Sequence, residues 1–125
     1  MGSRLRVYIV DDDPIVLKTI DGILEDDFRR TCFTNGEDCL AAIAAAKPEI
    51  VLLEMARPGI DGLDLCHRLK SDWDTQDIQV VFVSASDDID TRLLCYEAGG
   101  DDFIQKPFEP TELLRKLQVS KRILA

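Results

Sequence analysis

The chain has 125 residues, which is enough for one domain with a buried core and too few for two independent domains. Hydrophobic residues make up 46% and charged residues 31% of it, a balance that is typical of globular proteins and excludes a disordered or collagen-like chain. Its 15 Lys and Arg against 24 Asp and Glu give a formal net charge of -9, which repels phosphate backbones and anionic lipid, so we expect this domain to bind neither nucleic acid nor membrane.

Short apolar runs alternate along the chain with longer stretches of helical periodicity, a pattern typical of strands and helices around a parallel sheet. In chain order we predict strand 5–10, helix 14–24, strand 30–33, helix 37–46, strand 50–53, helix 63–70, strand 80–83, helix 90–98, strand 102–105 and helix 110–123. Right-handed crossovers between five such units predict an α/β fold with a doubly wound, five-stranded parallel sheet.

Residues with special capping or turn preferences mark several boundaries. Asp12 or Asp13 is placed to cap the first helix. The dipeptides N-G at 35–36 and D-G at 61–62 are interpreted as loop and turn residues. The pair G-G at 99–100 is predicted to end the fourth helix.

Polar side chains follow four of the predicted strands directly. The first strand runs into Asp11 and Asp12, the third into Glu54, the fourth into Ser84 and the fifth into Lys106. Ligands of doubly wound sheets bind beyond the carboxyl ends of the strands, so we expect these groups to meet in one pocket. Converging carboxylates stay ionised only beside cations, and Mg²⁺ with oxygen ligands suits such a place. Together with a lysine and a hydroxyl, they favour phosphoryl transfer to a carboxylate.

Four short motifs carry a resemblance to a known family. They are V-D-D-D-P at 10–14, L-L-E-x-x-x-P-G-x-D-G at 52–62, V-S-A at 83–85 and K-P-F at 106–108. In this order, each at the end of a predicted strand, they resemble the receiver domain of bacterial two-component response regulators over nearly the whole chain. The resemblance implies a flavodoxin-like (βα)5 fold with strand order 2-1-3-4-5, and a phosphorelay signalling role rather than an enzyme.

The resemblance also implies a magnesium site. Asp12 would bind Mg²⁺ directly and Asp11 through a water molecule. Glu54, at the position of the phosphate acceptor, would be a further ligand, and Ala56 would offer its backbone carbonyl.

A switch is implied as well. Ser84 would contact the phosphoryl oxygens, Lys106 would pair with them, and Pro107 would fix the loop through a cis peptide bond. Phe103 matches the aromatic switch position; taken alone, an aromatic residue in a strand is more often a core residue, and only the resemblance makes the two interpretations about equal. As Ser84 moves toward the phosphate, the aromatic ring would turn into the space it leaves and alter the face of the fourth helix, fifth strand and fifth helix.

The partners implied are a histidine kinase or phosphotransfer protein as phosphate donor, and an output or effector domain as target. A homodimer through the same face of the fourth helix, fifth strand and fifth helix is a further hypothesis. The leucines there do not by themselves distinguish core from interface, namely Leu93, Leu94, Leu113 and Leu117.

Glu54 departs from the family pattern, which has an aspartate at this position. The extra methylene moves the carboxylate by roughly 1.5 Å, and a displacement on the order of 1 Å can cost about a hundredfold in rate. We therefore predict weak or absent phosphorylation at Glu54. The longer side chain could reach Lys106 or Ser84 and imitate part of a phosphorylated aspartate, or it could simply block the pocket.

Three alternatives remain at this level. One is a phosphorylation-independent pseudo-receiver that acts only as an interaction module. Another is a small haloacid-dehalogenase-like phosphatase with Asp11 as nucleophile, but the D-x-D-x-[TV] pattern fails at Ile15 and the chain offers no cap domain. A nucleotide-binding or flavin-binding domain fits least, because the loop after the first strand has no glycine to approach a phosphate.

The cysteines and the chain ends bear on compartment and boundaries. Cys32, Cys39, Cys66 and Cys95 form no C-x-x-C pair, so we expect them to be buried small hydrophobes in a reducing cytosol. No apolar run approaches the roughly 20 residues that span a bilayer, and no signal peptide is recognised, so we expect a cytoplasmic protein. Residues 1–3 are interpreted as a cloning remnant, which leaves 4–125 as the receiver domain.

Overall fold

The computed structural model describes residues 4–54, 61–86 and 88–124. Within them, five parallel strands form one sheet in the order β2-β1-β3-β4-β5, so the predicted doubly wound topology is confirmed. The elements are β1 (Arg6–Val10), α1 (Pro14–Leu24), β2 (Arg29–Phe33), α2 (Gly36–Ala45), β3 (Ile50–Glu54), α3 (Gly62–Ser71), β4 (Gln79–Ser84), α4 (Ile89–Glu97), β5 (Asp102–Gln105) and α5 (Pro110–Leu124). None of the helices in this described part is long and apolar enough to cross a membrane.

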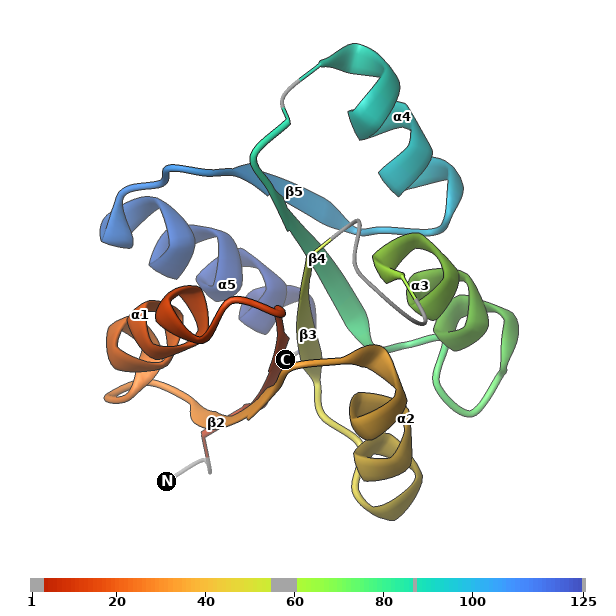
Figure 1. Cartoon of the computed structure of the whole chain (residues 1–125). Coiled ribbons are helices and arrows are strands. Elements are labelled where there is room, and N and C mark those ends of the chain that lie inside the picture. Colours follow the sequence, from red (N-terminus) through yellow and green to blue (C-terminus); the bar gives the residue numbers. More distant parts are fainter. Residues whose placement is uncertain (1–3, 55–60, 87, 125) are drawn as a thin grey trace.

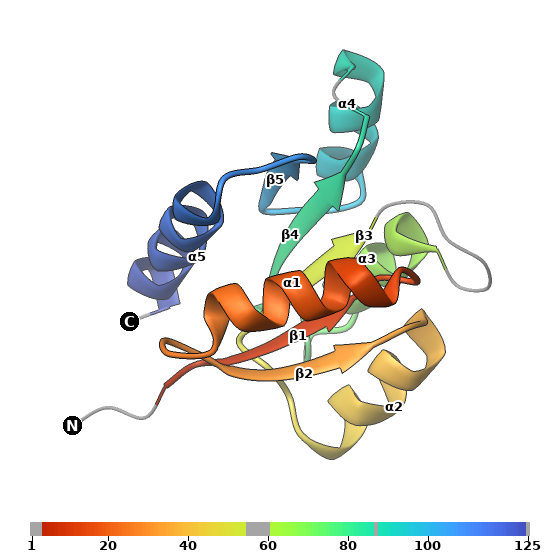
Figure 2. The same cartoon turned by 60° about the vertical axis from the view of Figure 1, so that its left-hand side comes forward.

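The helices cover both faces of the sheet, α1 and α5 on one side and α2, α3 and α4 on the other (Figures 1 and 2). Successive strand residues point to opposite faces. Val7 and Ile9 of β1 therefore pack with α1 and α5, whereas Tyr8 and Val10 pack with α2 and α3. The central strands are buried on both faces, as the aliphatic run at 50–53 predicts.

The register of the strands brings their carboxyl ends to one edge of the sheet. The last paired residues are Val10 with Leu53, Glu54 with Val83, and Ser84 with Gln105. The residues at or just after these pairs are those that the sequence singles out. The sheet thus gathers the polar groups at the edge where doubly wound folds bind ligands.

Side-chain caps set the helix starts, which for α2, α3 and α4 lie one residue before the predicted starts. The side-chain oxygen of Asn35 accepts a hydrogen bond from the backbone N–H three residues on, at 2.8 Å, and Asp61 and Asp88 do the same at 2.8 and 2.7 Å. Asp13, rather than Asp12, caps α1. After α4, Gly99 adopts a φ of 101°, as expected of a glycine that ends a helix.

The prediction that all four cysteines are buried is wrong for Cys32, which is exposed. Its strand, β2, is at the edge of the sheet and is covered only partly by its neighbours. The Cys32 thiol lies 3.9 Å from the Asp21 carboxylate of α1. Cys39, Cys66 and Cys95 are buried, and burial raises the pKa of Cys66 to about 12 and that of Cys95 to about 11.

Candidate functional site

Asp11 is held in a buried position at the end of β1. Its backbone N–H donates to the carbonyl of Phe33 at 3.1 Å, which extends the pairing of β1 and β2 by one step. The residue is only 2% exposed. One carboxylate oxygen, Oδ1, accepts from the backbone N–H of Asp13 at 2.9 Å, and Asp13 in turn caps α1. The turn that starts α1 therefore fixes the orientation of the Asp11 carboxylate.

Lys106 connects two of the acidic residues. Its backbone N–H donates to the carbonyl of Ser84 at 2.8 Å, and the following bond to Pro107 is cis, in the conformation the resemblance implies. Its ammonium Nζ lies 2.6 Å from Oε2 of Glu54 and 3.0 Å from Oδ2 of Asp11. The structure thus brings Asp11, Glu54 and Lys106 together, although they are far apart in the sequence.

The charges in this cluster do not balance. Asp11, Asp12 and Glu54 carry three carboxylates against one ammonium. Burial raises the pKa of Glu54, the Lys106 hydrogen bond and charge partly offset this, and the charges of Asp11 and Asp12 raise it further. Burial alone would lower the pKa of Lys106, but its hydrogen bonds to Glu54 and Asp11 outweigh that effect and raise it. The cluster keeps an excess of negative charge that favours a further cation.

Of the two candidate contacts for Glu54, the structure contains the one to Lys106. Among the described residues, no hydrogen bond joins Glu54 to the Ser84 hydroxyl. Ser84 is 5% exposed, and its Oγ accepts from the backbone N–H of Ser86 at 3.2 Å. Phe103 is also 5% exposed and packs in the core on the α3 and α4 side of the sheet.

The residues present fit magnesium only in part. Asp12 is exposed beside the buried Asp11, and carboxylate oxygens are the ligands that Mg²⁺ prefers. Ala56, a predicted ligand, lies outside the described residues. In the described portion, no group of three His, Cys, Asp or Glu side chains is placed to hold a metal ion. The donor chemistry therefore points to Asp11 and Asp12, while the Glu54 carboxylate is engaged by Lys106.

The leucines near the predicted output face separate into core and surface. Leu113 and Leu117 of α5 are fully buried beneath the sheet. Leu93 and Leu94 of α4 are 51% and 46% exposed. Of these four leucines, the two exposed ones are therefore on α4.

An apolar groove of about 260 Å³ adjoins the site. One side is formed by α1, through Ile15, Val16, Thr19 and Ile23, and the other by the segment 106–110 that begins with Lys106. Ile15 projects from the first turn of α1 and is 76% exposed. A partner that docks here would lie directly beside the Lys106 end of the pocket.

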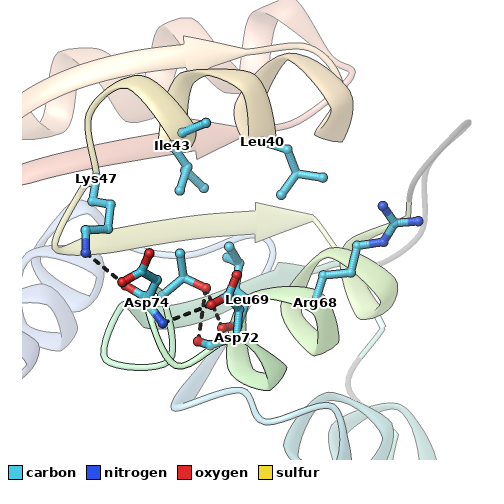
Figure 3. Close-up of a pocket in the computed structure, with 9 residues that line it drawn as sticks. Leu40, Ile43, Lys47, Arg68, Leu69, Asp72 and Asp74 are labelled. Atoms are coloured by element: carbon cyan, nitrogen blue, oxygen red, sulfur yellow. Dashed lines mark hydrogen bonds between the residues drawn. The ribbon is translucent and has the colours of Figure 1, made fainter.

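A second cavity, of about 490 Å³, lies between α2 and the end of α3, on the opposite side of the sheet from α1 (Figure 3). Leu40, Ile43 and Leu69 give it apolar walls, and at one end the Lys47 ammonium donates to the carbonyl of Asp74 at 2.9 Å. None of the acidic strand-end residues lines it. We assign it no part in the site.

The structure adds residues that the sequence did not single out. Ser86 and Thr91 connect the end of β4 to α4, and Arg92 lies over the ring of Phe103. The signal available in the sequence was Asp88, which is placed to cap a helix starting at Ile89. The position of Arg92 depends on how α4 packs, so no local pattern predicts it.

Comparisons with known proteins agree on one family. A family profile described as response regulator receiver domain matches residues 7–118. The DNA-binding response regulator MtrA of Mycolicibacterium smegmatis is 32% identical over 120 residues, which are 95% of this chain and 51% of that protein. The chain thus spans about half the length of the curated relatives it matches.

Solved structures give the same result. The BeF3-activated receiver domain of DrrB, from Thermotoga maritima, is 28% identical with a TM-score of 0.88, over 96% of this chain and 99% of that one. The BeF3-activated N-terminal receiver domain of RstA from Klebsiella pneumoniae is 31% identical with a TM-score of 0.84, over 92% and 97%. The fold and the sequence are therefore similar to the same group of proteins.

Proposed function

The chain belongs to the response regulator receiver domain family, and from this premise we propose that it is a receiver in which Glu54 largely prevents phosphorylation of the acceptor position. The contact that carries the proposal is the one between Lys106 Nζ and Glu54 Oε2, at 2.6 Å. In the family role, Lys106 would pair with phosphoryl oxygens. Here two of its three N–H groups already face carboxylates, Glu54 and Asp11.

An incoming phosphoryl group would have to displace Glu54 from Lys106. Displacement would leave a mostly buried carboxylate without its cation, in a cluster that already carries excess negative charge. In-line attack by Glu54 itself would require the same carboxylate to leave Lys106 and to point at the donor phosphorus. Both requirements oppose phosphorylation.

The Glu54 contact also supports a partial imitation of the phosphorylated state. It supplies an anion to Lys106 as a phosphoryl group would, but with fewer oxygens and less charge. Ser84, the other group expected on the phosphoryl oxygens, stays hydrogen-bonded to the backbone of Ser86. Phe103 is nevertheless buried. We therefore propose a receiver whose switch residue takes the inward position without a phosphate.

Mg²⁺ belongs to this proposal through Asp11 and Asp12. When bound, the ion would offset the excess negative charge of the acidic cluster. Asp12 is exposed and free to bind it, whereas Asp11 is already hydrogen-bonded on both oxygens. We propose that Mg²⁺ binds more weakly to this protein than to a Glu54→Asp variant, in which the shorter carboxylate would not contact Lys106.

The partners follow from the family and from the surfaces beside the site. A histidine kinase or phosphotransfer protein would dock on the groove between α1 and segment 106–110, which is apolar and borders Lys106. Because MtrA is about twice as long and is described as DNA-binding, we propose that an output domain accompanies this receiver. The exposed face of α4, with Leu93 and Leu94, is proposed as the contact to that domain or to a second copy.

The pseudo-receiver alternative is favoured by the same Lys106–Glu54 contact, since a pocket blocked by its own carboxylate needs no phosphate to keep its shape. The phosphatase alternative has less support. Its nucleophile would be Asp11, whose two carboxylate oxygens accept hydrogen bonds from the Asp13 backbone and from Lys106. A buried carboxylate held in this way is poorly placed to attack a phosphate ester.

Incubation with Mg²⁺ and acetyl phosphate, followed by intact mass spectrometry, tests the proposal. We expect the Glu54→Asp variant to gain an acid-stable, base-labile phosphoryl group, and the parent and a Glu54→Gln control to gain little or none. Equal labelling of the parent at Glu54 would show that the geometric reasoning is wrong and that this is an ordinary regulated receiver. If the Asp variant also stays unlabelled, the pseudo-receiver alternative takes its place.

A further inference from the structure

The connection from β4 to α4 is tied together by short side chains. The backbone N–H of Ser86 donates to the Ser84 hydroxyl, and the Ser86 hydroxyl lies 3.1 Å from that of Thr91 and donates to the Asp88 carboxylate at 3.1 Å. Asp88 also caps α4 by accepting from the backbone N–H of Thr91 at 2.7 Å. Thr91 is only 8% exposed. The first turn of α4 is therefore linked, through Ser86, to the residue expected to contact a phosphate.

The next residue of α4, Arg92, covers the switch ring. The guanidinium carbon lies 5.1 Å from the centroid of the Phe103 ring, within the distance at which a cation is attracted by an aromatic face. Phe103 itself belongs to the buried core beneath α3 and α4. Arg92 is exposed and forms no ion pair with a carboxylate among the described residues, so the ring is the group that its charge faces.

We propose that Arg92 is a positioning residue that holds Phe103 in the buried orientation. The Asp88 cap sets where α4 begins, and the Ser86–Thr91 pair ties this first turn to the end of β4. The helix then carries Arg92 over the ring one residue after Thr91. A ring that swings outward would lose its contact with the cation and would meet the guanidinium in its path. The same contact biases the α4 side of the domain toward one arrangement.

This inference rests on the proposed role of Phe103 as the switch residue and adds the element that keeps the ring in place. In a receiver that is rarely phosphorylated, an intramolecular contact has to favour the buried orientation of the ring, as phosphorylation does in a regulated receiver. Arg92 is suited to this because its charge is permanent. The bias would therefore not depend on the Glu54 pocket alone.

The first test asks whether the contact exists in solution. We expect the side-chain methylene protons of Arg92 next to the guanidinium to be shifted upfield by the ring in the NMR spectrum. The shift should vanish in a Phe103→Leu variant. Arg92 proton shifts that equal those of the exposed Arg115, and that do not change in this variant, would overturn the proposal.

The second test asks whether the charge of Arg92 positions the ring. The protein labelled with 4-fluorophenylalanine reports the solvent exposure of each of its five Phe rings through the H2O/D2O isotope shift, and Phe103→Leu assigns the resonance. We expect Arg92→Met, which keeps an apolar side chain of similar length, to increase the outward population about two- to fivefold, the shift that an exposed cation–π contact supplies. Arg92→Lys should preserve most of the effect, and Arg115→Met is the matched control.

If Arg92 contributed only the packing of its side chain, Arg92→Met would leave the outward population of the Phe103 ring unchanged. That result would refute the proposal even with every variant folded. Failure of the proposed function gives a different signature, because phosphorylation is read separately by mass. Equal labelling of the parent and the Glu54→Asp variant would end the proposed function, whereas an unchanged ring in Arg92→Met would end only the present inference.

Discussion

Removal of the Lys106 charge is the perturbation with the most specific expected outcome. In a Lys106→Gln variant, Asp11 and Glu54 lose the cation that lies 3.0 and 2.6 Å from them. The side chains of these three residues are 3% to 22% exposed, so water replaces the ammonium poorly. At an effective dielectric constant of about 20, a pair of charges about 3 Å apart interacts by roughly 5 kcal/mol.

Desolvation of the ions offsets part of this interaction in the parent protein. Breaking a buried pair by removing one partner commonly costs about 3–5 kcal/mol, and the residual exposure of Lys106 places this case at about 3 kcal/mol. That is a large share of the roughly 5–15 kcal/mol that stabilises a typical domain. Urea denaturation followed by circular dichroism, without Mg²⁺, measures the loss.

The loss should depend on pH with a defined sign. The pKa of Glu54 is already raised by burial, and it rises further when the hydrogen bond from Lys106 is removed. A carboxyl with a raised pKa in the folded state stabilises most when protonated, and this contribution is lost as the pH rises through its folded-state pKa. The variant should therefore be furthest below the parent at pH 7–8 and closer to it near pH 5, while lysine stays protonated throughout.

Two matched variants make the comparison decisive. Lys116→Gln removes a lysine of α5 that pairs with Asp102 at 3.1 Å, where both side chains are 30% exposed, and should cost at most about 1 kcal/mol. Adding Glu54→Gln to Lys106→Gln removes one of the unpaired carboxylates and should recover part of the loss. The reasoning is refuted if Lys106→Gln costs no more than Lys116→Gln, or if its cost is the same at pH 5 and pH 8.

Three further outcomes are expected. Mg²⁺ should raise the melting temperature of Glu54→Asp more than that of the parent, measured by calorimetry, and Asp12→Asn should remove the increase in both. Gly99→Ala should lower the free energy of unfolding by about 1–2 kcal/mol in the same urea assay, because φ is 101° and the added Cβ would lie 2.7 Å from a side-chain carbon of Lys70. Gly22→Ala should instead raise it by up to about 1 kcal/mol, because the Cβ added to this helical glycine would meet nothing from outside its own helix within 4 Å. In the native protein Cys32 should be the thiol that reacts with a thiol reagent, although slowly because partial burial and the Asp21 carboxylate raise its pKa, and the three buried thiols should react only after unfolding.

The order of strands and helices could be predicted because each element carries its own periodicity. The residues that were misread at boundaries share one cause, as Asn35 and Asp61 belong to residue types that favour both turns and helix caps. For α1 the sequence left two candidate caps, Asp12 and Asp13, and the structure selects Asp13, which directly precedes the proline at the first helical position. Cys32 was misread because the expectation rested on the residue type alone, whereas its strand also contains Arg29, Arg30 and Thr31 and lies at the edge of the sheet.

The site could be predicted as a set but not as an arrangement. Strand ends gather in a parallel sheet whatever the side-chain rotamers are, so the meeting of Asp11, Glu54 and Lys106 follows from topology. Whether Glu54 reaches Lys106 or Ser84 depends on rotamers and on the hydrogen bond that already engages Ser84. The contact of Arg92 with Phe103 depends in the same way on the packing of α4.

The length of one side chain is enough to separate a regulated pocket from a blocked one. An aspartate at position 54 would end one methylene earlier, by roughly 1.5 Å. With the backbone and Lys106 unchanged, the 2.6 Å contact between Glu54 and Lys106 would then open beyond hydrogen-bonding distance, while Asp11 would continue to hold the ammonium. Lys106 would be left with a free N–H facing the pocket, and the shorter carboxylate would leave room for a phosphoryl group.

Glu54→Asp therefore changes both the acceptor and the availability of the lysine, so a gain of phosphorylation in that variant would reflect the two effects together. Lys106→Gln in the Glu54→Asp background separates them, because it retains the acceptor and removes the lysine.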